Sequence, residues 1–315
     1  MESSFVPRKK FILLLAGPTA VGKTTLAIEL AKLFNTVIIS CDSRQFYREL
    51  AIGTAKPTRE EQQGIPHYFI DSHSIQDLFG AGDYERAALE LLNELFERHD
   101  VLIVTGGSGL FIKALVEGLD EMPPVPLAIR TELMERLEAE GLEKLANELT
   151  QLDAEYAAKV DPKNAQRVVR ALEMIQYTGL PFSHFHQKKK INRDFEWIKI
   201  ALNRPREELY ARINQRVEDM LKAGLLEEVR AVSPFRTHNA LQTVGYKEVF
   251  MYFDELISYD EMVALIQQNT RRYAKRQLTW FRNQDVFQWF HPDDQEEIKD
   301  WIEKALQKGG VNSDR

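Results

Sequence analysis

Eight residues near the amino terminus have the types and spacing needed to bind phosphate groups. They read Gly17-Pro18-Thr19-Ala20-Val21-Gly22-Lys23-Thr24 and fit the pattern G-x-x-x-x-G-K-[ST]. The two glycines let the backbone turn so that successive N–H groups point at phosphate oxygens. The Lys23 ammonium adds charge for the terminal phosphate, and the Thr24 hydroxyl can ligate Mg²⁺. This segment, the phosphate-binding loop, predicts that the protein binds a di- or triphosphate.

The elements around this loop are those of a doubly wound α/β protein. The apolar run 11–15 predicts a strand before the loop, and the amphipathic run 26–34 predicts a helix after it, whose N-terminus supports the anion. Further strands are predicted at 36–40 and 101–104, with a helix at 84–98 whose stripe Ala87, Leu91 and Leu95 is expected to face the core. The predicted fold class is a P-loop NTPase-like parallel sheet flanked by helices.

Two polar residues follow the predicted strands at 36–40 and 101–104. Asp42 is the only acid that immediately follows one of these strands, and Ser108 comes after Thr105-Gly106-Gly107. Ligands bind outside the carboxyl ends of parallel strands, so we expect both residues on the same rim as the phosphate-binding loop. No acid follows strand 101–104, where many nucleotide hydrolases hold Mg²⁺. This pattern departs from that of a generic ATPase, and a helix cap and an indirect Mg²⁺ ligand are the structural roles open to Asp42.

A proline cluster at 121–126 interrupts the strand–helix alternation and predicts a domain boundary. The residues after it are helical in pattern and contain no strand. We therefore expect an all-helical insertion at 120–196 within a catalytic core formed by 1–119 and 197–315. A short edge strand is expected at 286–290, followed by a solvated acidic helix.

Length and composition indicate an ordinary globular protein. The chain has 315 residues, of which 44% are apolar and 28% charged. It has no apolar run of about 18 residues that could span a membrane and no apolar signal segment, so no membrane association is expected. Its single cysteine, Cys41, excludes an intramolecular disulfide and fits a reducing cytoplasm.

The net charge of −7 hides two basic segments. Residues 162–193 hold seven basic residues and one acid, and residues 271–282 hold five basic residues and no acid. The basic residues are Lys163, Arg167, Arg170, Lys188, Lys189, Lys190 and Arg193 in the first segment, and Arg271, Arg272, Lys275, Arg276 and Arg282 in the second. In the second segment they alternate with Tyr273, Trp280 and Phe281. Arginines with aromatic side chains favour single-stranded or loop RNA as a partner, although solvated helix faces are the alternative.

Six stretches of the sequence together resemble the tRNA dimethylallyltransferases, also called tRNA isopentenyltransferases, of the bacterial type. They are GPTAVGKTTLA (17–27), DSRQFYRELAIGTAKP (42–57), GGSGLFIKALVEGL (106–119), QRVVRALE (166–173), VGYKE (244–248) and YAKRQLTWFR (273–282). They occur in the family's order and cover nearly the whole chain. Several of them are not features of nucleotide kinases in general.

The resemblance implies transfer of a dimethylallyl group from dimethylallyl diphosphate to N6 of the adenosine 3′-adjacent to the anticodon of a tRNA. Lys23, the loop amides and Mg²⁺ on Thr24 would stabilise the leaving diphosphate. Asp42 stands at the family's position for the general base. Ser108 replaces the usual threonine and keeps its hydroxyl, whereas Phe111 replaces the usual tyrosine and loses one.

The resemblance also implies substrate contacts residue by residue. Thr19 within the loop matches a position near the diphosphate, and so does Arg216, with Arg212 beside it. The implied tRNA contacts are Asp42, Ser43, Arg44, Gln45, Ser108, Arg130, Gln166, Arg167, Val168, Val169, Arg170, Gln242, Gly245, Tyr246, Lys247, Lys275, Arg276, Gln277, Thr279, Trp280 and Arg282. The implied partners are the anticodon stem-loop and dimethylallyl diphosphate, and we expect a monomer.

Three other functions use part of the same pattern. A small-molecule or nucleotide kinase would use the phosphate-binding loop but not the two basic segments. An adenylate isopentenyltransferase would share the loop and Asp42 and have little use for the helical insertion. A non-enzymatic RNA-binding module would leave Lys23, Thr24 and Asp42 unexplained.

Overall fold

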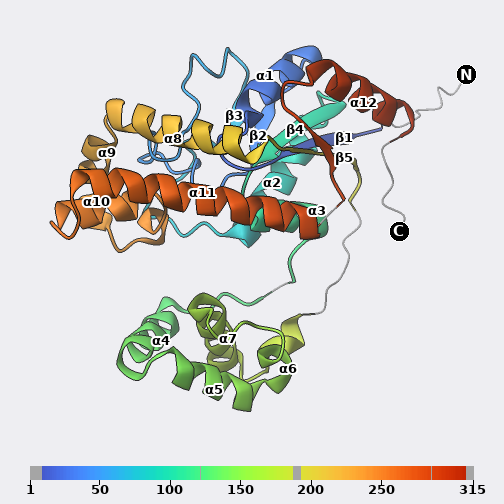
Figure 1. The fold of residues 1–315 in the computed structure, drawn as a ribbon. Helices are drawn as coiled ribbons and strands as arrows, with labels where there is room; N and C mark the ends of the chain where they lie inside the picture. The colour runs from blue at the N-terminus through green and yellow to red at the C-terminus, as the bar shows by residue number, and fades with distance from the viewer. Residues whose placement is uncertain (1–8, 121, 187–192, 285, 310–315) are drawn as a thin grey trace, which may run out of the picture. The chain divides into compact units, whose positions relative to one another are not determined.

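The computed structural model describes residues 9–120, 122–186, 193–284 and 286–309. They form two compact units (Figure 1). One, the core unit, holds the described residues of Met1–Val116 and Asn192–Arg315, and the other, the helical unit, those of Glu117–Ile191. The sequence prediction placed these boundaries at 120 and 196. Lys188, Lys189 and Lys190 lie outside the described residues.

The core unit is built on one six-stranded parallel sheet with the strand order β3-β2-β4-β1-β5-β6 (Figure 1). The strands are β1 (Phe11–Ala16), β2 (Ile38–Ser40), β3 (His67–Tyr68), β4 (Val101–Gly106), β5 (Glu196–Leu202) and β6 (Gln288–Phe290). The predicted parallel α/β core is confirmed, and so is the edge strand near 286–290. The edge strand β3 was not predicted, because two residues are too short to show a pattern.

The helices of the core unit are α1 (Lys23–Leu33), α2 (Ala81–Leu95), α3 (Gly109–Glu117), α8 (Arg206–Lys222), α9 (Leu225–Ala231), α10 (Tyr246–Phe253), α11 (Tyr259–Gln284) and α12 (Gln295–Gln307), with short 3₁₀ turns at Ser233–Phe235 and Asn239–Leu241. The helices lie against this sheet or, like α9 and α10, against other helices (Figure 1). Of the predicted α2 stripe, Leu95 is buried, whereas Ala87 and Leu91 are only half-buried and the neighbouring Ala88 and Leu92 are buried instead. Among the helices of the described residues, none is both long and apolar enough to cross a membrane.

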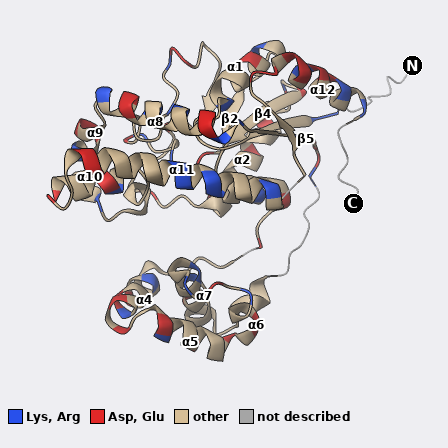
Figure 2. Cartoon of the chain, in the orientation of Figure 1, with Lys and Arg blue, Asp and Glu red and all other residues tan. Residues whose placement is uncertain are grey.

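The helix α12 differs from the solvated helix expected for the acidic tail. Its acidic face is exposed (Figure 2), but Ile298, Ile302 and Ala305 are buried in the main hydrophobic core beside β1, β5 and α1. The expectation rested on the acidic residues of the segment, whereas its apolar residues, at spacings of four and three, fix its position. The C-terminal helix is therefore part of the core unit's packing.

The helical unit has a small hydrophobic core of its own. It consists of α4 (Leu127–Glu140), α5 (Leu142–Leu152), α6 (Ala154–Ala157), α7 (Ala165–Thr178) and a 3₁₀ turn at Phe182–Phe185. Leu133, Leu145 and Leu149 pack with Val168 and Val169 of α7 in this core. The unit is all-helical over its described residues, as predicted.

Replacing Ile302 by alanine tests the role of α12. Ile302 is fully buried, so the cavity left by the change should destabilise the core unit by about 3 kcal/mol. We expect faster amide hydrogen exchange in β1, which reports opening of this core. The exposed Leu256 offers a control, and Leu256→Ala should leave that exchange unchanged. Equal exchange in both variants would show that α12 does not stabilise the core.

Candidate functional site

The carboxyl ends of three neighbouring strands bring the predicted site residues together. In the sheet β4 lies between β1 and β2, so the phosphate-binding loop, Ser108 and Asp42 lie on one rim. The backbone N–H of Ser43 donates to Oγ of Ser108 over 2.8 Å, which ties the two strand ends to each other. Gly106 permits this approach, since a Cβ there would lie 2.0 Å from the Cys41 carbonyl oxygen. The expected common rim is confirmed.

The phosphate-binding loop has the conformation that its glycines predict. Gly17 and Gly22 have φ values of 152° and 113°, in the region that favours glycine. Lys23 Nζ donates to the carbonyls of Gly17 and Pro18 over 2.9 and 2.8 Å. Thr24 is exposed in the first turn of α1. The loop thus carries an ammonium group and a free helix N-terminus at one place.

The Lys23 ammonium is held in an environment that disfavours its charge. Burial lowers its pKa to about 8; Asp42 acts in the opposite direction, and the positive charge of Arg216 adds to the lowering. Burial, with Arg212 as the next cause, likewise lowers the pKa of Arg216. Positive groups that are desolvated and near each other are stabilised by an anion. These shifts therefore indicate an anion site.

Two arginines of α8 contact the outer part of the loop. Arg212 Nε donates to the Ala20 carbonyl over 2.9 Å, and an Arg216 Nη atom donates to Oγ1 of Thr19 over 3.2 Å. Arg216 and Thr19, which the resemblance places separately near the diphosphate, contact each other here. The α8 helix thus places two more positive charges beside the anion site.

Asp42 performs one structural task and faces the loop at the same time. Its Oδ1 accepts hydrogen bonds from the N–H groups of Arg44 and Gln45 over 2.9 and 3.4 Å and so closes a turn; residues 43–46 form no helix, so the alternative of a helix cap is wrong. Its negative charge also acts on Lys23 and Arg216 across the rim. A carboxylate fixed by a turn beside an anion site can accept a proton from a second substrate.

Tyr273 of α11 is a site residue that the sequence predicted only as one of several aromatics. Burial raises the pKa of its hydroxyl to about 12, and the charge of Asp42 adds to this, while Arg44 and the hydroxyl of Ser108 act in the opposite direction. Tyr273 therefore lies at the carboxylate and serine of the rim. Its spacing of four from Gln277, which puts both on one helix face, was the available signal.

Gln277 joins the phosphate-binding loop to the turn after β4. Its Oε1 accepts from the N–H of Thr19 and its Nε2 donates to the carbonyl of Gly107, each over 2.9 Å. A Cβ at residue 107 would lie 2.3 Å from that Nε2, so a side chain there would displace the Gln277 amide. The side chain is buried and uses both ends of its amide internally. In this position it supports the loop and is not free to bind a base.

The opposite face of α11 carries the exposed basic residues, visible as a row of blue segments (Figure 2). The exposed polar residues are Arg272, Lys275, Arg276, Thr279 and Arg282. Trp280 is half-buried and packs on Gly109, where a Cβ would lie 2.4 Å from its ring. Phe281 is fully buried, and Arg271 donates to Asn214 over 2.6 Å. This face, without Phe281 and Arg271, remains available to a polyanion.

Gln45 and Tyr246, which the resemblance implies as tRNA contacts, make internal hydrogen bonds instead. Gln45 Nε2 donates to the carbonyls of Thr54 and Ala55, each over 3.2 Å. Tyr246 is fully buried and donates to Glu228 over 2.6 Å. These two side chains support the segment after Asp42. Of their neighbours in sequence, Gln242 and Lys247 are exposed, and Gly245 is buried.

The helical unit brings together basic residues that are distant in sequence. Arg130 of α4 and Arg170 of α7 both pair with the buried Glu173, at 3.7 and 3.0 Å. Gln166 and Arg167 are exposed on α7, whereas Val168 and Val169 point into the unit's core. Arg193 belongs to the core unit, where it pairs with Glu85 at 2.7 Å. Arg193 is therefore not part of this basic surface.

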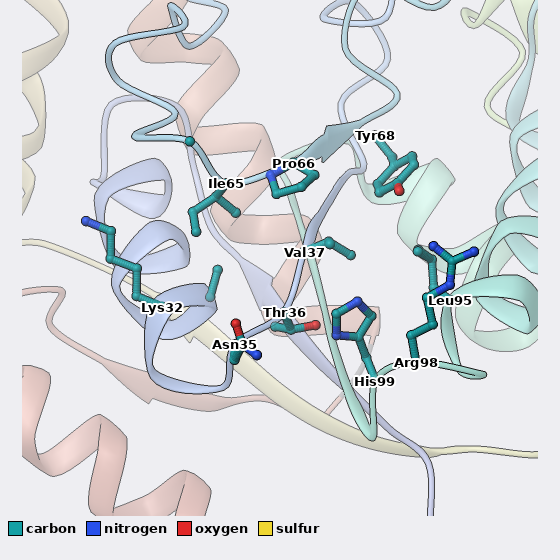
Figure 3. A pocket seen from close by; sticks show the side chains of 12 residues that line it. Lys32, Asn35, Thr36, Val37, Ile65, Pro66, Tyr68, Leu95, Arg98 and His99 are labelled. Atoms are coloured by element: carbon teal, nitrogen blue, oxygen red, sulfur yellow. The ribbon is translucent and has the colours of Figure 1, made fainter.

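A cavity of about 520 Å³ lies at the opposite, amino ends of β2 and β3 (Figure 3). Lys32, Arg98 and His99 line it. It is bordered by the C-termini of α1 and α2, whose carbonyl dipoles disfavour an anion. Lys32 is also hydrogen-bonded to Gln63. This cavity is separate from the rim that carries the site.

The fold and the rim define a parallel α/β protein in which a phosphate-binding loop faces a carboxylate. The family model described as IPP transferase matches residues 45–284, and the chain belongs to that family. It is 51% identical to the tRNA dimethylallyltransferase of Cytophaga hutchinsonii, over 95% of this chain and 98% of that protein.

Solved structures give the same relationship. A full-length tRNA isopentenylpyrophosphate transferase from Bacillus halodurans is 35% identical, with a TM-score of 0.71 over 96% of this chain and 98% of that chain. A eukaryotic dimethylallyltransferase acting on tRNA is 23% identical with a TM-score of 0.76, over 98% of this chain and 82% of that chain. At that identity the second likeness concerns the fold alone.

Gln277→Met tests the bridge between the two turns. Methionine keeps the volume and removes both hydrogen bonds, leaving the Thr19 N–H and the Gly107 carbonyl without their partner. The cost should be about 1–3 kcal/mol, so we expect at least about fivefold faster exchange in a peptide containing Thr19. Gln284→Met, an exposed change on the same helix, should have no effect. Unchanged exchange in Gln277→Met would show that the bridge does not hold the loop.

Proposed function

We propose that the protein transfers the dimethylallyl group of dimethylallyl diphosphate to N6 of the adenosine 3′-adjacent to the anticodon in tRNA. The observation that carries this proposal is the Asp42 carboxylate facing Lys23 and Arg216 of the anion site. An alkyl transfer to an amine needs both an anion site for the leaving group and a base for the amine proton. The names of the relatives, which describe tRNA prenylation, support the same assignment.

In this reaction the phosphate-binding loop holds a leaving group. The allylic C–O bond breaks, its electron pair goes to the diphosphate, and negative charge grows there. Lys23 and Arg216 are desolvated cations already placed beside that position. Preorganised positive charge of this kind stabilises the transition state more than the ground state.

Asp42 is the general base of this proposal. The adenine N6 forms the new C–N bond and gives up one proton, which passes to the carboxylate. The turn at Arg44 and Gln45 holds Oδ1 of Asp42 and thereby fixes the orientation of the group. Ser108, buried beside it, and Tyr273 are assigned to positioning the amine.

Magnesium fits the donor set at the loop. The exposed Thr24 hydroxyl offers one neutral oxygen, and Mg²⁺ takes most of its ligands from water and phosphate oxygens. The cluster Glu208, His291 and Asp293, which has metal-ligand types, is the one found among the described residues, and it does not include Thr24 or Asp42. We propose that Thr24 holds Mg²⁺ when the diphosphate is bound. The ion would supply further charge neutralisation of the leaving group.

The RNA is proposed to bind the exposed basic face of α11 and the basic residues of the helical unit. Phosphates would pair with arginines and lysines, and unstacked bases would stack on aromatic side chains such as Trp280. The proposed contacts are Ser43, Arg44, Arg130, Gln166, Arg167, Arg170, Gln242, Lys247, Lys275, Arg276, Thr279, Trp280 and Arg282. We further propose that the enzyme acts as a cytoplasmic monomer.

A transfer assay with three acceptors tests this function against its alternatives. The protein is incubated with Mg²⁺, labelled dimethylallyl diphosphate and either unmodified tRNA, AMP or ATP. Label on the tRNA at the adenosine beside the anticodon is the expected result. Label on AMP or ATP but not on tRNA would contradict the proposal and indicate an adenine-nucleotide prenyltransferase.

Asp42→Asn separates the proposed role of Asp42 as a base from its role in holding the turn at Arg44 and Gln45. Asparagine keeps an oxygen that can accept from the Arg44 N–H but cannot take up the N6 proton. We expect kcat to fall by about 10²–10⁴-fold while the Kd of an anticodon stem-loop stays within twofold. Equal losses of binding and rate would mean that Asp42 serves structure alone.

The lowered pKa of Lys23 predicts the pH dependence of diphosphate binding. With a pKa of about 8 in the free protein, Lys23 is charged below that pH and loses its proton as the pH rises through it. A saturated analogue, isopentyl diphosphate, is fully ionised over this range because phosphate has a second pKa of about 6. Its affinity should therefore fall by about tenfold between pH 7 and 9.5. Lys23→Met should bind weakly with a flat profile, and a flat profile in the unaltered protein would contradict the shift.

A further inference from the structure

Arg204, between β5 and α8, lies directly behind the phosphate-binding loop. Its side chain is only 7% exposed. Its Nε donates to the carbonyl of Val21 over 2.9 Å. Arg204 thus contacts the loop backbone at Val21, a contact that the sequence did not suggest.

Two carboxylates hold the guanidinium of Arg204 in place. Its two Nη atoms donate to the two oxygens of Asp293 over 3.1 and 2.7 Å, and one of them also donates to Glu208. Burial lowers the pKa of Arg204, but the hydrogen bonds of Asp293 and Glu208 outweigh burial and raise the pKa above its usual value. His291 contacts Glu208 at 3.4 Å and Asp293 at 3.7 Å. A bidentate pair of this kind fixes orientation as well as charge.

The segment after β6 also packs against the turn of the loop. At Gly22, where φ is 113°, an added Cβ would lie 3.6 Å from Pro292 and 3.7 Å from an Nη atom of Arg204. Pro292 stands between the two residues that contact this cluster, His291 and Asp293. The last turn of the loop before Lys23 is therefore bounded by Arg204 and the 291–293 segment.

Arg204, just before α8, begins a row of side chains spaced by four residues that continues along this helix. Glu208, Arg212 and Arg216 follow it, and the three arginines contact three successive loop residues, Val21, Ala20 and Thr19. Arg212 and Arg216 bring charge to the anion site. Arg204 is bonded to two carboxylates, so it adds little net charge and its contribution is geometric.

We propose that Arg204, held by Asp293, is a positioning residue of the diphosphate site. It sets the Val21 carbonyl and thereby the direction of the loop N–H groups and of Lys23. The inference rests on the proposed function, since it takes an alkyl diphosphate as the ligand of the loop. It makes the 291–293 segment part of that site through the contact of Asp293 with Arg204.

Asp293→Asn distinguishes positioning from electrostatics by the sign of its effect. Removing a negative charge near the loop should strengthen the binding of an anion if charge alone matters. If Asp293 acts by fixing Arg204, the same change loses the bidentate pair and weakens binding. We expect a Kd for isopentyl diphosphate about five- to tenfold higher by calorimetry. A Kd that is unchanged or lower would overturn the proposal.

Two further variants separate geometry from charge at Arg204 itself. Arg204→Met should raise the same Kd by about tenfold or more, and Arg204→Lys should not restore it, because one ammonium cannot contact Val21 and pair bidentately with Asp293. Asp254→Asn, which breaks the distant exposed pair with Arg236, serves as the control and should leave the Kd unchanged. Recovery of binding in Arg204→Lys would contradict the proposed geometry.

RNA binding shows whether the effect is specific to the diphosphate. The Kd of an anticodon stem-loop should stay within twofold in Asp293→Asn, and parallel losses for both ligands would show a general structural defect and overturn the proposal. The readout is binding and not transfer. A protein that binds isopentyl diphosphate with the expected variant effects but transfers no prenyl group would contradict the proposed function while supporting this inference.

Discussion

The site depends on holding positive groups close together where they have little water. Lys23 and Arg216 repel each other, and burial lowers the pKa of both. This arrangement of buried positive charges destabilises the unliganded protein, and a bound anion offsets that electrostatic cost. Everything else at the rim serves this arrangement. The strand order places the loop, and Asp42 supplies a charge of opposite sign that acts on both Lys23 and Arg216.

The loop is held from two sides by side chains from distant parts of the sequence. On one side Gln277 of α11 takes the Thr19 N–H and the Gly107 carbonyl. On the other, Arg212 of α8 and Arg204, which precedes that helix, donate to the carbonyls of Ala20 and Val21. The α11 helix has a second role, because its opposite face carries the exposed arginines proposed to bind RNA. The same helix therefore contributes to both proposed substrate sites.

The sequence predicts those features of the site that depend on a local motif. The phosphate-binding loop and the placement of Asp42 and Ser108 follow from a motif and from the rule on strand ends. The contacts of Gln277, Tyr273 and Arg204 could not be predicted in this way, because they depend on how α8 and α11 pack against the sheet. Resemblance alone also overreached at Val168 and Tyr246, whose burial makes them packing residues. The acidic composition of the C-terminal segment predicted a solvated helix, although the apolar residues of α12 are buried.

The central claim is that a loop with the spelling of a nucleotide-binding site serves carbon transfer, so the bond that breaks is the decisive observable. Dimethylallyl diphosphate carrying ¹⁸O at the bridging oxygen between carbon and phosphorus distinguishes the two chemistries. Mass spectrometry of the products formed with tRNA should find the label in the released diphosphate, because the C–O bond breaks. Label retained in dimethylallyl alcohol, or a phosphoryl group on the acceptor, would show P–O cleavage and contradict the account.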